Sequence, residues 1–417
     1  MGRKSRNKNK SDRDEFAVMP SSSRKERAYD EGDLSDAESY STNATLDDDM
    51  LSVTNDDDNE SAIDTSEAVN NLAEYLENAG HKRVPIRIAA MDILRRILMR
   101  CSIADELMNW KSTILDVIEK ALRRTDEEIC AAAVLAALVS IQLGSEINEE
   151  IETALTIMRE ICTDPAKAES VRVHCINAVA LCSYLSVTQA DSLCAAVSAL
   201  RTVWTSTKVN TPAPSVFDSA IASWVLLIGQ AGKRSLEAAL QDQPKLCLFL
   251  GGAQVSIRIA AAEALGVLYE AACEIFGEDY HFPNHNHLLE MLESLITDSV
   301  KYRTKKDRRL QRSTVRHVYS ALRNQETSPM RIRFASEVLI LESLSEKLLY
   351  SFICNCLRGG LNTHLKTNLL LRELFSLGPP QVEMPTKIPK LQRLAVQNAL
   401  NKERDIKRSK QRDKRAC

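Results

Sequence analysis

The 417-residue sequence lacks two features that would direct a chain to or through a membrane. Its apolar runs, such as 131–141 and 220–228, are shorter than the roughly 18 residues that a membrane-spanning helix requires. Its first residues are basic and polar, without the hydrophobic core of a secretory signal. We therefore expect no membrane partner, and we expect the protein in the cytoplasm and the nucleus.

Motifs of common enzyme classes are also missing. Gly251-Gly252 and Gly359-Gly360 are isolated pairs without the Gly-x-x-x-x-Gly-Lys pattern that cradles phosphates. No Ser, His and acid set indicates a nucleophilic centre. We predict that the protein is not an enzyme and that it uses no cofactor and no small-molecule substrate. A catalytic pair drawn from distant helices is the alternative.

Potential metal ligands have simpler explanations. His281, His285 and His287 lie in a Pro-containing segment without a matching Cys or carboxylate cluster, which favours a solvated loop between helices over a metal site. Cys354 and Cys356 lie in an apolar helical run, which favours packing over metal or redox chemistry. Most of the 11 cysteines replace small apolar residues in helical patterns. We predict reduced packing thiols and no bound metal.

Charge is abundant but unevenly distributed. The chain has 54 Lys and Arg against 57 Asp and Glu, a net charge of −3. Residues 1–67 carry 9 basic and 18 acidic side chains, whereas residues 301–417 carry 26 basic and 10 acidic ones. Such polarity predicts an acidic tail at one end and a polyanion-binding region at the other.

Residues 1–67 form the predicted tail. The stretch 31–60 has eleven acidic residues, no basic residue and few large apolar ones. It cannot bury enough surface to offset the entropy of an ordered chain, so we expect an acidic, Ser-rich and disordered segment. Ser35 and Thr45 precede acidic residues in the manner of acidophilic-kinase acceptors and are candidate phosphorylation sites.

Residues 68–300 contain an internal repeat. Val84-Pro-Ile-Arg-Ile-Ala-Ala-Met-Asp-Ile-Leu94 matches Val255-Ser-Ile-Arg-Ile-Ala-Ala-Ala-Glu-Ala-Leu265 at seven of eleven positions. Related segments between them place successive copies about 43 residues apart, the period of armadillo and HEAT repeats. Ala-rich stripes also suit a plain helical bundle, but the period favours an all-α armadillo/HEAT-like α-solenoid with an extended concave surface.

The chain changes character after residue 300. We predict a smaller helical C-terminal domain at 301–380, which begins with a basic cluster at 301–316 and continues as apolar helical sequence from about 334 to 377. Pro379 and Pro380 end it. A linker and a long basic terminal helix then occupy 381–417, and a helix from 389 to 415 would extend roughly 40 Å.

The second half of this terminal helix has almost nothing to bury. Eight basic residues stand between 402 and 415: Lys402, Arg404, Lys407, Arg408, Lys410, Arg412, Lys414 and Arg415. Lys and Arg bind nucleic-acid phosphates with release of counterions. Aromatics that could stack on bases are absent from 390–417, which favours backbone recognition over sequence readout. A nuclear-import signal and a solvated helix face are the alternatives.

Four segments together resemble the interferon-related developmental regulator family. They are Ser35-Asp-Ala-Glu-Ser-Tyr-Ser-Thr-Asn-Ala-Thr-Leu-Asp-Asp-Asp49, Lys306-Asp-Arg-Arg-Leu-Gln-Arg-Ser313, Leu377-Gly-Pro-Pro380 and Arg408-Ser-Lys-Gln-Arg-Asp-Lys-Arg-Ala416. The resemblance covers nearly the whole chain. It implies an armadillo-like fold without catalytic activity.

The resemblance also implies two roles. One is ribosomal: the solenoid binds inactive ribosomes in their intersubunit tRNA sites, the terminal helix enters the mRNA channel, and translation is repressed. The other is nuclear: a transcriptional co-regulator in differentiation acts through co-repressor and histone deacetylase complexes. The bare basic helix fits the ribosomal role better. The RNA-binding residues that the resemblance implies are those eight basic residues, supported by Lys305, Lys306, Arg308 and Arg309.

Overall fold

The structure is a computed structural model of the chain. It describes residues 70–297 except 210 and 212, residues 305–325, 327–334 and 337–380, and Lys402. The predicted tail at 1–67, with Ser35 and Thr45, lies outside these residues. The linker at 381–401 and the predicted terminal helix beyond Lys402 also lie outside them.

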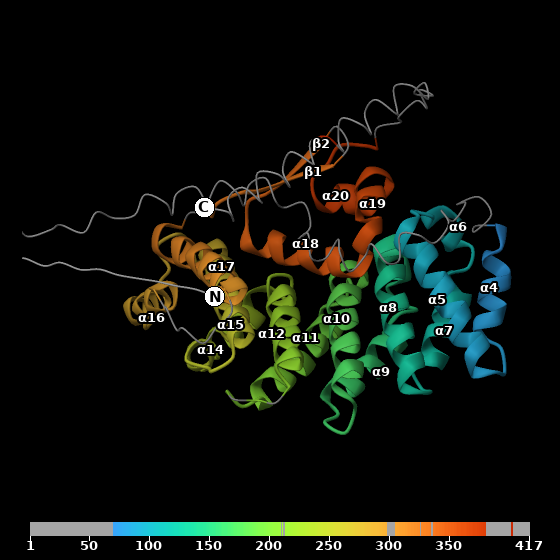
Figure 1. Cartoon of the computed structure of the whole chain (residues 1–417), viewed down its shortest axis with the longest axis horizontal. Helices are drawn as coiled ribbons and strands as arrows, with labels where there is room; N and C mark the ends of the chain where they lie inside the picture. Colours follow the sequence, from blue (N-terminus) through green and yellow to red (C-terminus); the bar gives the residue numbers. More distant parts are fainter. Residues whose placement is uncertain are drawn as a thin grey trace, which may run out of the picture. The chain divides into compact units, whose positions relative to one another are not determined.

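The described chain consists almost entirely of α-helices joined by short loops (Figure 1). The first thirteen are α4 (Leu72–Ala79), α5 (Val84–Arg100), α6 (Ala104–Met108), α7 (Lys111–Ala121), α8 (Asp126–Leu143), α9 (Glu152–Thr163), α10 (Glu169–Ser186), α11 (Ala190–Ser206), α12 (Pro214–Ile228), α13 (Gly232–Leu240), α14 (Gln243–Leu250), α15 (Val255–Phe276) and α16 (His285–Thr297). They are followed by α17 (Lys305–Asn324), strands β1 (Met330–Phe334) and β2 (Glu337–Leu341), α18 (Leu344–Leu357), α19 (Leu361–Thr367) and α20 (Leu369–Leu374).

Five long helices form the inner row of a solenoid. Helices α5, α8, α10, α12 and α15 begin 41 to 45 residues apart, and each contacts the next. Helices α4, α7, α9 and α11 form a second row against them. The all-α, armadillo-like solenoid and its period of about 43 residues are therefore confirmed.

Helix α8 lies between α5 and α10 and is nearly all buried. Its buried alanines, Ala132, Ala133 and Ala136, allow neighbouring helices to approach closely. By length and composition alone, Asp126–Ile147 could cross a membrane, but 78% of its most apolar window is buried within the chain. The predicted run ends at residue 141, but the apolar stretch continues past it because Gln142 is a single polar residue followed by Leu143. Its burial is typical of a core helix.

An arginine recurs as the fourth residue of three inner helices. Arg87 begins this series in α5, Arg172 follows in α10 and Arg258 in α15. Each guanidinium donates to a carbonyl of the chain that leads into its helix. The accepting carbonyls are those of His81 and Lys82 for the first, Cys162 for the second and Gly252 for the third. The repeated Arg thus fixes how the preceding segment enters each of these helices.

Arg87 also joins its helix to the next inner helix. Its Nε donates to Oε1 of Glu128 at 2.7 Å, and the Glu128 side chain is fully buried. Glu128 also forms a capping box with Thr125 at the start of α8. Burial opposes ionisation of Glu128, but the hydrogen bonds from Arg87 and Thr125 outweigh it, so the pKa lies below its usual value.

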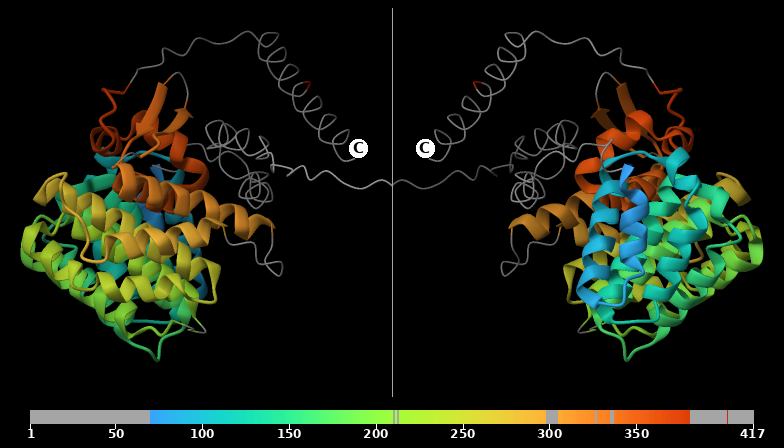
Figure 2. Two further views of the ribbon diagram at one scale, coloured as in Figure 1. Left: turned by 90° about the vertical axis from the view of Figure 1, so that its left-hand side faces the viewer. Right: turned by 90° about the vertical axis from the view of Figure 1, so that its right-hand side faces the viewer.

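Strands β1 and β2 pair antiparallel as a β-hairpin, and the predicted helix from about 334 is wrong here. Met330 pairs with Leu341 and Phe334 with Glu337. Side chains alternate between exposed and buried along both strands, a period of two that suits a half-buried strand and not a helix. Figure 2 shows the orange hairpin beside the red helices α19 and α20. From α18 onward the chain is helical again, as predicted.

Helix α18 crosses the inner row and contacts α5, α8, α10, α12 and α15 (Figure 1). At its start, the Glu270 carboxylate of α15 accepts the backbone N–H groups of Leu344 and Ser345, both at 3.0 Å. Beyond its other end, His364 Nε2 lies 3.1 Å from the Leu98 carbonyl of α5, and Asn368 donates to Ile141 O of α8 at 2.9 Å. We call α18, α19 and α20 with their connections the strap.

The strap meets α5 at Gly360. A Cβ atom built on Gly360 would lie 1.7 Å from the Met99 carbonyl oxygen, whereas one on Gly359 would meet nothing within 4 Å. The two backbones can therefore approach only because residue 360 has no side chain.

Gly360→Ala is expected to destabilise the protein by about 1 to 3 kcal/mol, because the backbone must shift away from α5. The adjacent Gly359→Ala is the matched control and should leave the free energy of unfolding nearly unchanged. Urea unfolding of both variants measures the difference. Equal stability of the two variants would contradict the contact between the strap and α5.

Glu128→Ala is expected to cost about 3 to 5 kcal/mol, since it leaves a buried guanidinium without its carboxylate. Glu127→Ala, an exposed residue in the same helical turn, is the control. The folded-state pKa of Glu128 is lowered, so its contribution is complete above the unfolded value of 4.5 and is lost as the pH falls below it. Urea unfolding at pH 7 should therefore separate wild type from Glu128→Ala more than unfolding at pH 4, and the opposite order would refute this assignment.

Candidate nucleic-acid interface

Helix α17 is amphipathic, with one apolar and one basic side. Its buried residues recur at helical spacing: Gln311, Val315, Val318 and Leu322. Its exposed arginines are Arg309, Arg316 and Arg323, each seven residues from the next. Seven residues are nearly two turns, so these guanidinium groups follow one stripe at intervals of about 10 Å. We call them the α17 arginine stripe.

Buried hydrogen bonds hold α17 in place. Gln311 Oε1 accepts Nη2 of Arg258 at 2.8 Å, and its Nε2 donates to the Leu295 carbonyl of α16 at 3.0 Å. The repeated Arg of α15 therefore orients α17 in the way that Arg87 orients α8. The helix that carries the stripe is therefore held by buried polar contacts.

Of the four predicted supporting residues of 305–309, Arg308 and Arg309 differ in how exposed they are. Lys305 and Lys306 lie in the first turn of α17, but their side chains are outside the described residues. Arg308 is half-buried, whereas Arg309 is exposed and belongs to the stripe. Lys402 is exposed, and the other seven predicted residues of the terminal helix lie outside the described chain.

Sequence reasoning missed the exposed arginines of the hairpin. Arg331 and Arg333 project from the outer face of β1, opposite Ile340 and Val338 of β2, which are 47% and 45% exposed. The inner face is buried and apolar. The alternation Arg-Ile-Arg-Phe carries this signal, since residues two apart in a strand share a face.

These groups are suited to bind phosphate. Arginine presents five N–H donors in a planar fork that matches phosphate oxygens and keeps its charge at all physiological pH values. Between 305 and 325 the sequence has seven Lys or Arg and one acidic residue, Asp307. The surface can therefore contact a nucleic-acid backbone, and such contacts carry no sequence information.

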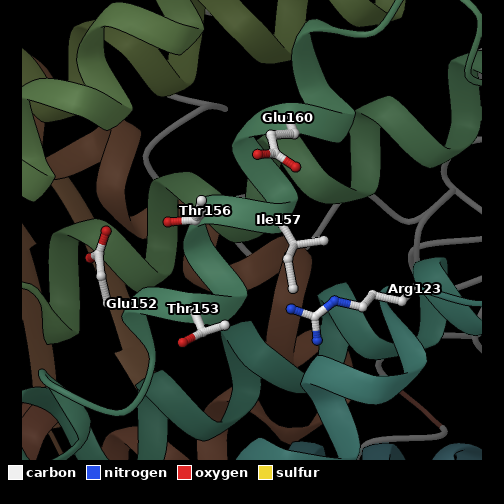
Figure 3. Close-up of a pocket in the computed structure, with 6 residues that line it drawn as sticks. All are labelled: Arg123, Glu152, Thr153, Thr156, Ile157 and Glu160. Atoms are coloured by element: carbon white, nitrogen blue, oxygen red, sulfur yellow. The ribbon is translucent and has the colours of Figure 1, made fainter.

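A hollow of about 420 Å³ lies over α9 (Figure 3). It is lined by Arg123, Glu152, Thr153, Thr156, Ile157 and Glu160. Two of its three charged groups are engaged in ion pairs: Arg123 with Glu119 and Glu152 with Arg159, both at 2.6 Å. These are structural pairs on the surface of the outer helices.

Most described cysteines are packing groups, and the predicted loop histidines are divided between the segment before α16 and its first turn, where His285 and His287 lie. Among the described residues, no three His, Cys, Asp or Glu side chains gather as a metal site would need. The rings of His281 and His285 lie 4.7 Å apart, while His287 faces Glu290. Cysteines of the described chain are free, and burial raises the pKa of Cys354 to about 11 and that of Cys356 to about 12, which keeps these thiols protonated.

Comparison with known proteins identifies the family. Residues 33–323 match the family model "Interferon-related developmental regulator", and residues 368–416 match "Interferon-related protein conserved region". The chain belongs to the interferon-related developmental regulator family. The resemblance inferred from the sequence is confirmed.

Individual relatives agree. The chain is 31% identical to interferon-related developmental regulator 2 of Mus musculus over 378 residues, 85% of each chain. It is 30% identical to interferon-related developmental regulator 1 of Homo sapiens, over 80% of this chain and 78% of that one. A designed armadillo repeat protein of known structure is similar at 15% identity and a TM-score of 0.39, over 58% of this chain and 99% of that chain. The relatives' names describe regulators of development.

Proposed function

We propose that this regulator is not an enzyme and that it binds ribosomes through RNA phosphates and represses translation. The observation that carries the proposal is the α17 arginine stripe, on a helix held by buried hydrogen bonds. It lies near the start of residues 301–417, which have a net charge of +16. In this proposal the solenoid occupies the intersubunit space and the basic residues from Lys402 to Arg415 enter an RNA-lined channel. mRNA and tRNA would then be excluded.

Physical arguments support RNA as the partner. The stripe and the exposed basic residues of β1 are arginines. One guanidinium group can bind two phosphate oxygens at once. The stripe and the hairpin arginines belong to separate elements, so they can contact separate phosphates. Each phosphate that Lys or Arg neutralises releases counterions, and the binding therefore weakens as salt rises.

A nuclear co-regulator is the second candidate. The inner row of the solenoid retains a large apolar groove beside the strap, which suits a scaffold for co-repressor and histone deacetylase complexes. Residues 407–415 would then serve as an import signal. Recovery of deacetylase complexes with the protein should survive nuclease treatment if this candidate is right, and loss of recovery would exclude it.

Deletion of residues 388–417 is expected to weaken ribosome binding by at least about tenfold at low salt, because it removes the densest basic segment. Purified ribosomes and the full-length or truncated protein are sedimented through sucrose at several salt concentrations. The truncated protein should keep its melting temperature, since the deleted residues follow the strap. Sedimentation unchanged by the deletion would overturn the proposal.

Arg309→Gln with Arg316→Gln is expected to lower the slope of log affinity against log salt by about 1 to 2, since each lost phosphate contact lowers it by about 0.7 to 0.9. Lys208→Gln with Arg234→Gln removes two exposed cations of the solenoid and is the matched control. Filter binding to purified ribosomes gives both slopes. If control and stripe variants change the slope equally, the stripe is not the contact surface.

A further inference from the structure

A groove of about 1,140 Å³ runs along the inner row of the solenoid beside the strap. Its floor comes from α5, α8, α10, α12 and α15, and α18 forms one wall through Leu348, Ser351, Phe352 and Asn355. Leu310 of α17, 49% exposed, stands at one end. The groove volume exceeds that of a typical small-molecule pocket, which is about 300 to 1,000 Å³.

Small side chains create this space. The floor contains one or more alanines from each helix between α8 and α15: Ala131, Ala133, Ala137, Ala178, Ala222 and Ala260. Ala133, Ala137 and Ala178 are buried between the helices, and their short side chains leave the space above the floor open. The floor is therefore apolar. Such a surface can accept side chains from another chain.

Two carboxyl groups interrupt the apolar floor. Asp218 of α12 and Glu263 of α15 both line the groove, and both are only partly exposed. Oδ1 of Asp218 is buried without a hydrogen-bond partner, and the Ser256 side chain is the group that favours the ionised carboxyl. Among the described residues, no cation lies beside either Asp218 or Glu263. Glu128 of the same solenoid is fully buried, but it forms an ion pair with Arg87. The two groove acids differ from Glu128 because they have no such pair.

Burial dominates the titration of both groups, and no neighbouring cation lowers either pKa. Burial raises the pKa of Asp218 to about 6. Burial and the neighbouring Asp218 raise the pKa of Glu263 to about 7. An uncompensated carboxylate in an apolar environment is costly, and an incoming cation would remove that cost.

We infer that this groove binds an extended segment of a partner protein, which brings an arginine or lysine to Asp218 and Glu263 and lays small apolar side chains along the floor. Arginine suits the pair best because its five donors can satisfy two carboxylates at once. A nucleic acid is disfavoured, since its phosphates would face both acids. The far end is balanced differently: Asp92 is paired with Arg95 at 2.7 Å, and Arg358 adds a positive charge.

The groove sets the length of the segment. Packed helices lie about 8 to 10 Å apart, so the four steps from α5 to α15 span roughly 35 Å. An extended chain rises about 3.3 Å per residue and would cover this distance with about ten residues.

Degenerate peptides test the inference. Four pools of fluorescent decapeptides have Arg, Lys, Gln or Glu at one central position and mixtures of Ala, Leu, Val and Ser elsewhere. Fluorescence anisotropy with the full-length protein should show binding of the Arg pool, weaker binding of the Lys pool, and at least about tenfold weaker binding of the Gln and Glu pools.

Substitutions locate the site. Asp218→Asn with Glu263→Gln should lower the affinity for the Arg pool at least about tenfold, because the charges that recognise it are removed. Asp191→Asn with Glu237→Gln removes two exposed carboxylates, one on α11 and one on α13, and should leave the affinity unchanged. Equal loss in both variants would show non-specific attraction to an acidic surface. No preference among the four pools would equally overturn the inference.

The chain's own basic end is another possible occupant, and the deletion of 388–417 distinguishes it. If this deletion raises the affinity for the Arg pool tenfold or more, the groove holds the chain's own end and not a partner. The inference is independent of ribosome binding: Asp218→Asn with Glu263→Gln should bind ribosomes normally, and Arg309→Gln with Arg316→Gln should bind the Arg pool normally.

Discussion

The approach of Gly360 to the Met99 carbonyl is the contact on which the arrangement of the C-terminal region depends. A side chain at residue 360 would lie within 1.7 Å of that oxygen, so the strap can reach α5 only with glycine there. This contact attaches one end of the strap to α5, and the hydrogen bonds to the Glu270 carboxylate attach the other end to α15. Because both ends are attached, α18 must run across the inner row, and the groove beside it takes its shape from that path.

The attachment also satisfies backbone groups that the solenoid leaves open. The last carbonyls of an α-helix have no partner within the helix. Leu98 O lies near the end of α5 and Ile141 O near the end of α8, and the strap supplies a ring nitrogen of His364 to the first and the amide of Asn368 to the second. Gln142 donates to the carbonyls of Leu98 and Cys101 in the same region. The strap is therefore a polar as well as an apolar part of the core.

The sequence was sufficient to predict the solenoid but not the strap. Similar helices recur about every 43 residues, with small residues in the core and in several copies an Arg in the first turn. Because the pattern occurs several times, it can be recognised in the sequence. His364, Asn368 and Gly360 each act once, on residues more than two hundred positions away, and no periodicity marks such contacts. The hairpin was missed because two strands of five residues give too short an alternation to stand out from helical neighbours.

The candidate site shows the same division. The charge count identified 301–417 as a basic region, but only the helix geometry separates exposed Arg309 from half-buried Arg308. Asp218 and Glu263 look ordinary in the sequence, and their proximity becomes visible once the inner helices bring them into one groove. Two surfaces of opposite charge thus share one scaffold: the basic one is our proposed contact for nucleic-acid phosphates, and the acidic one is our proposed contact for a cationic segment.

The central claim is that the strap is docked on the inner row in the free protein. Hydrogen exchange of the full-length chain, followed by mass spectrometry, tests it most directly, because backbone amides exchange slowly only where structure protects them. The account predicts that the amides of α18, α19 and α20 exchange nearly as slowly as those of the core helix α8. Rapid exchange throughout the strap, with α8 still protected, would contradict it.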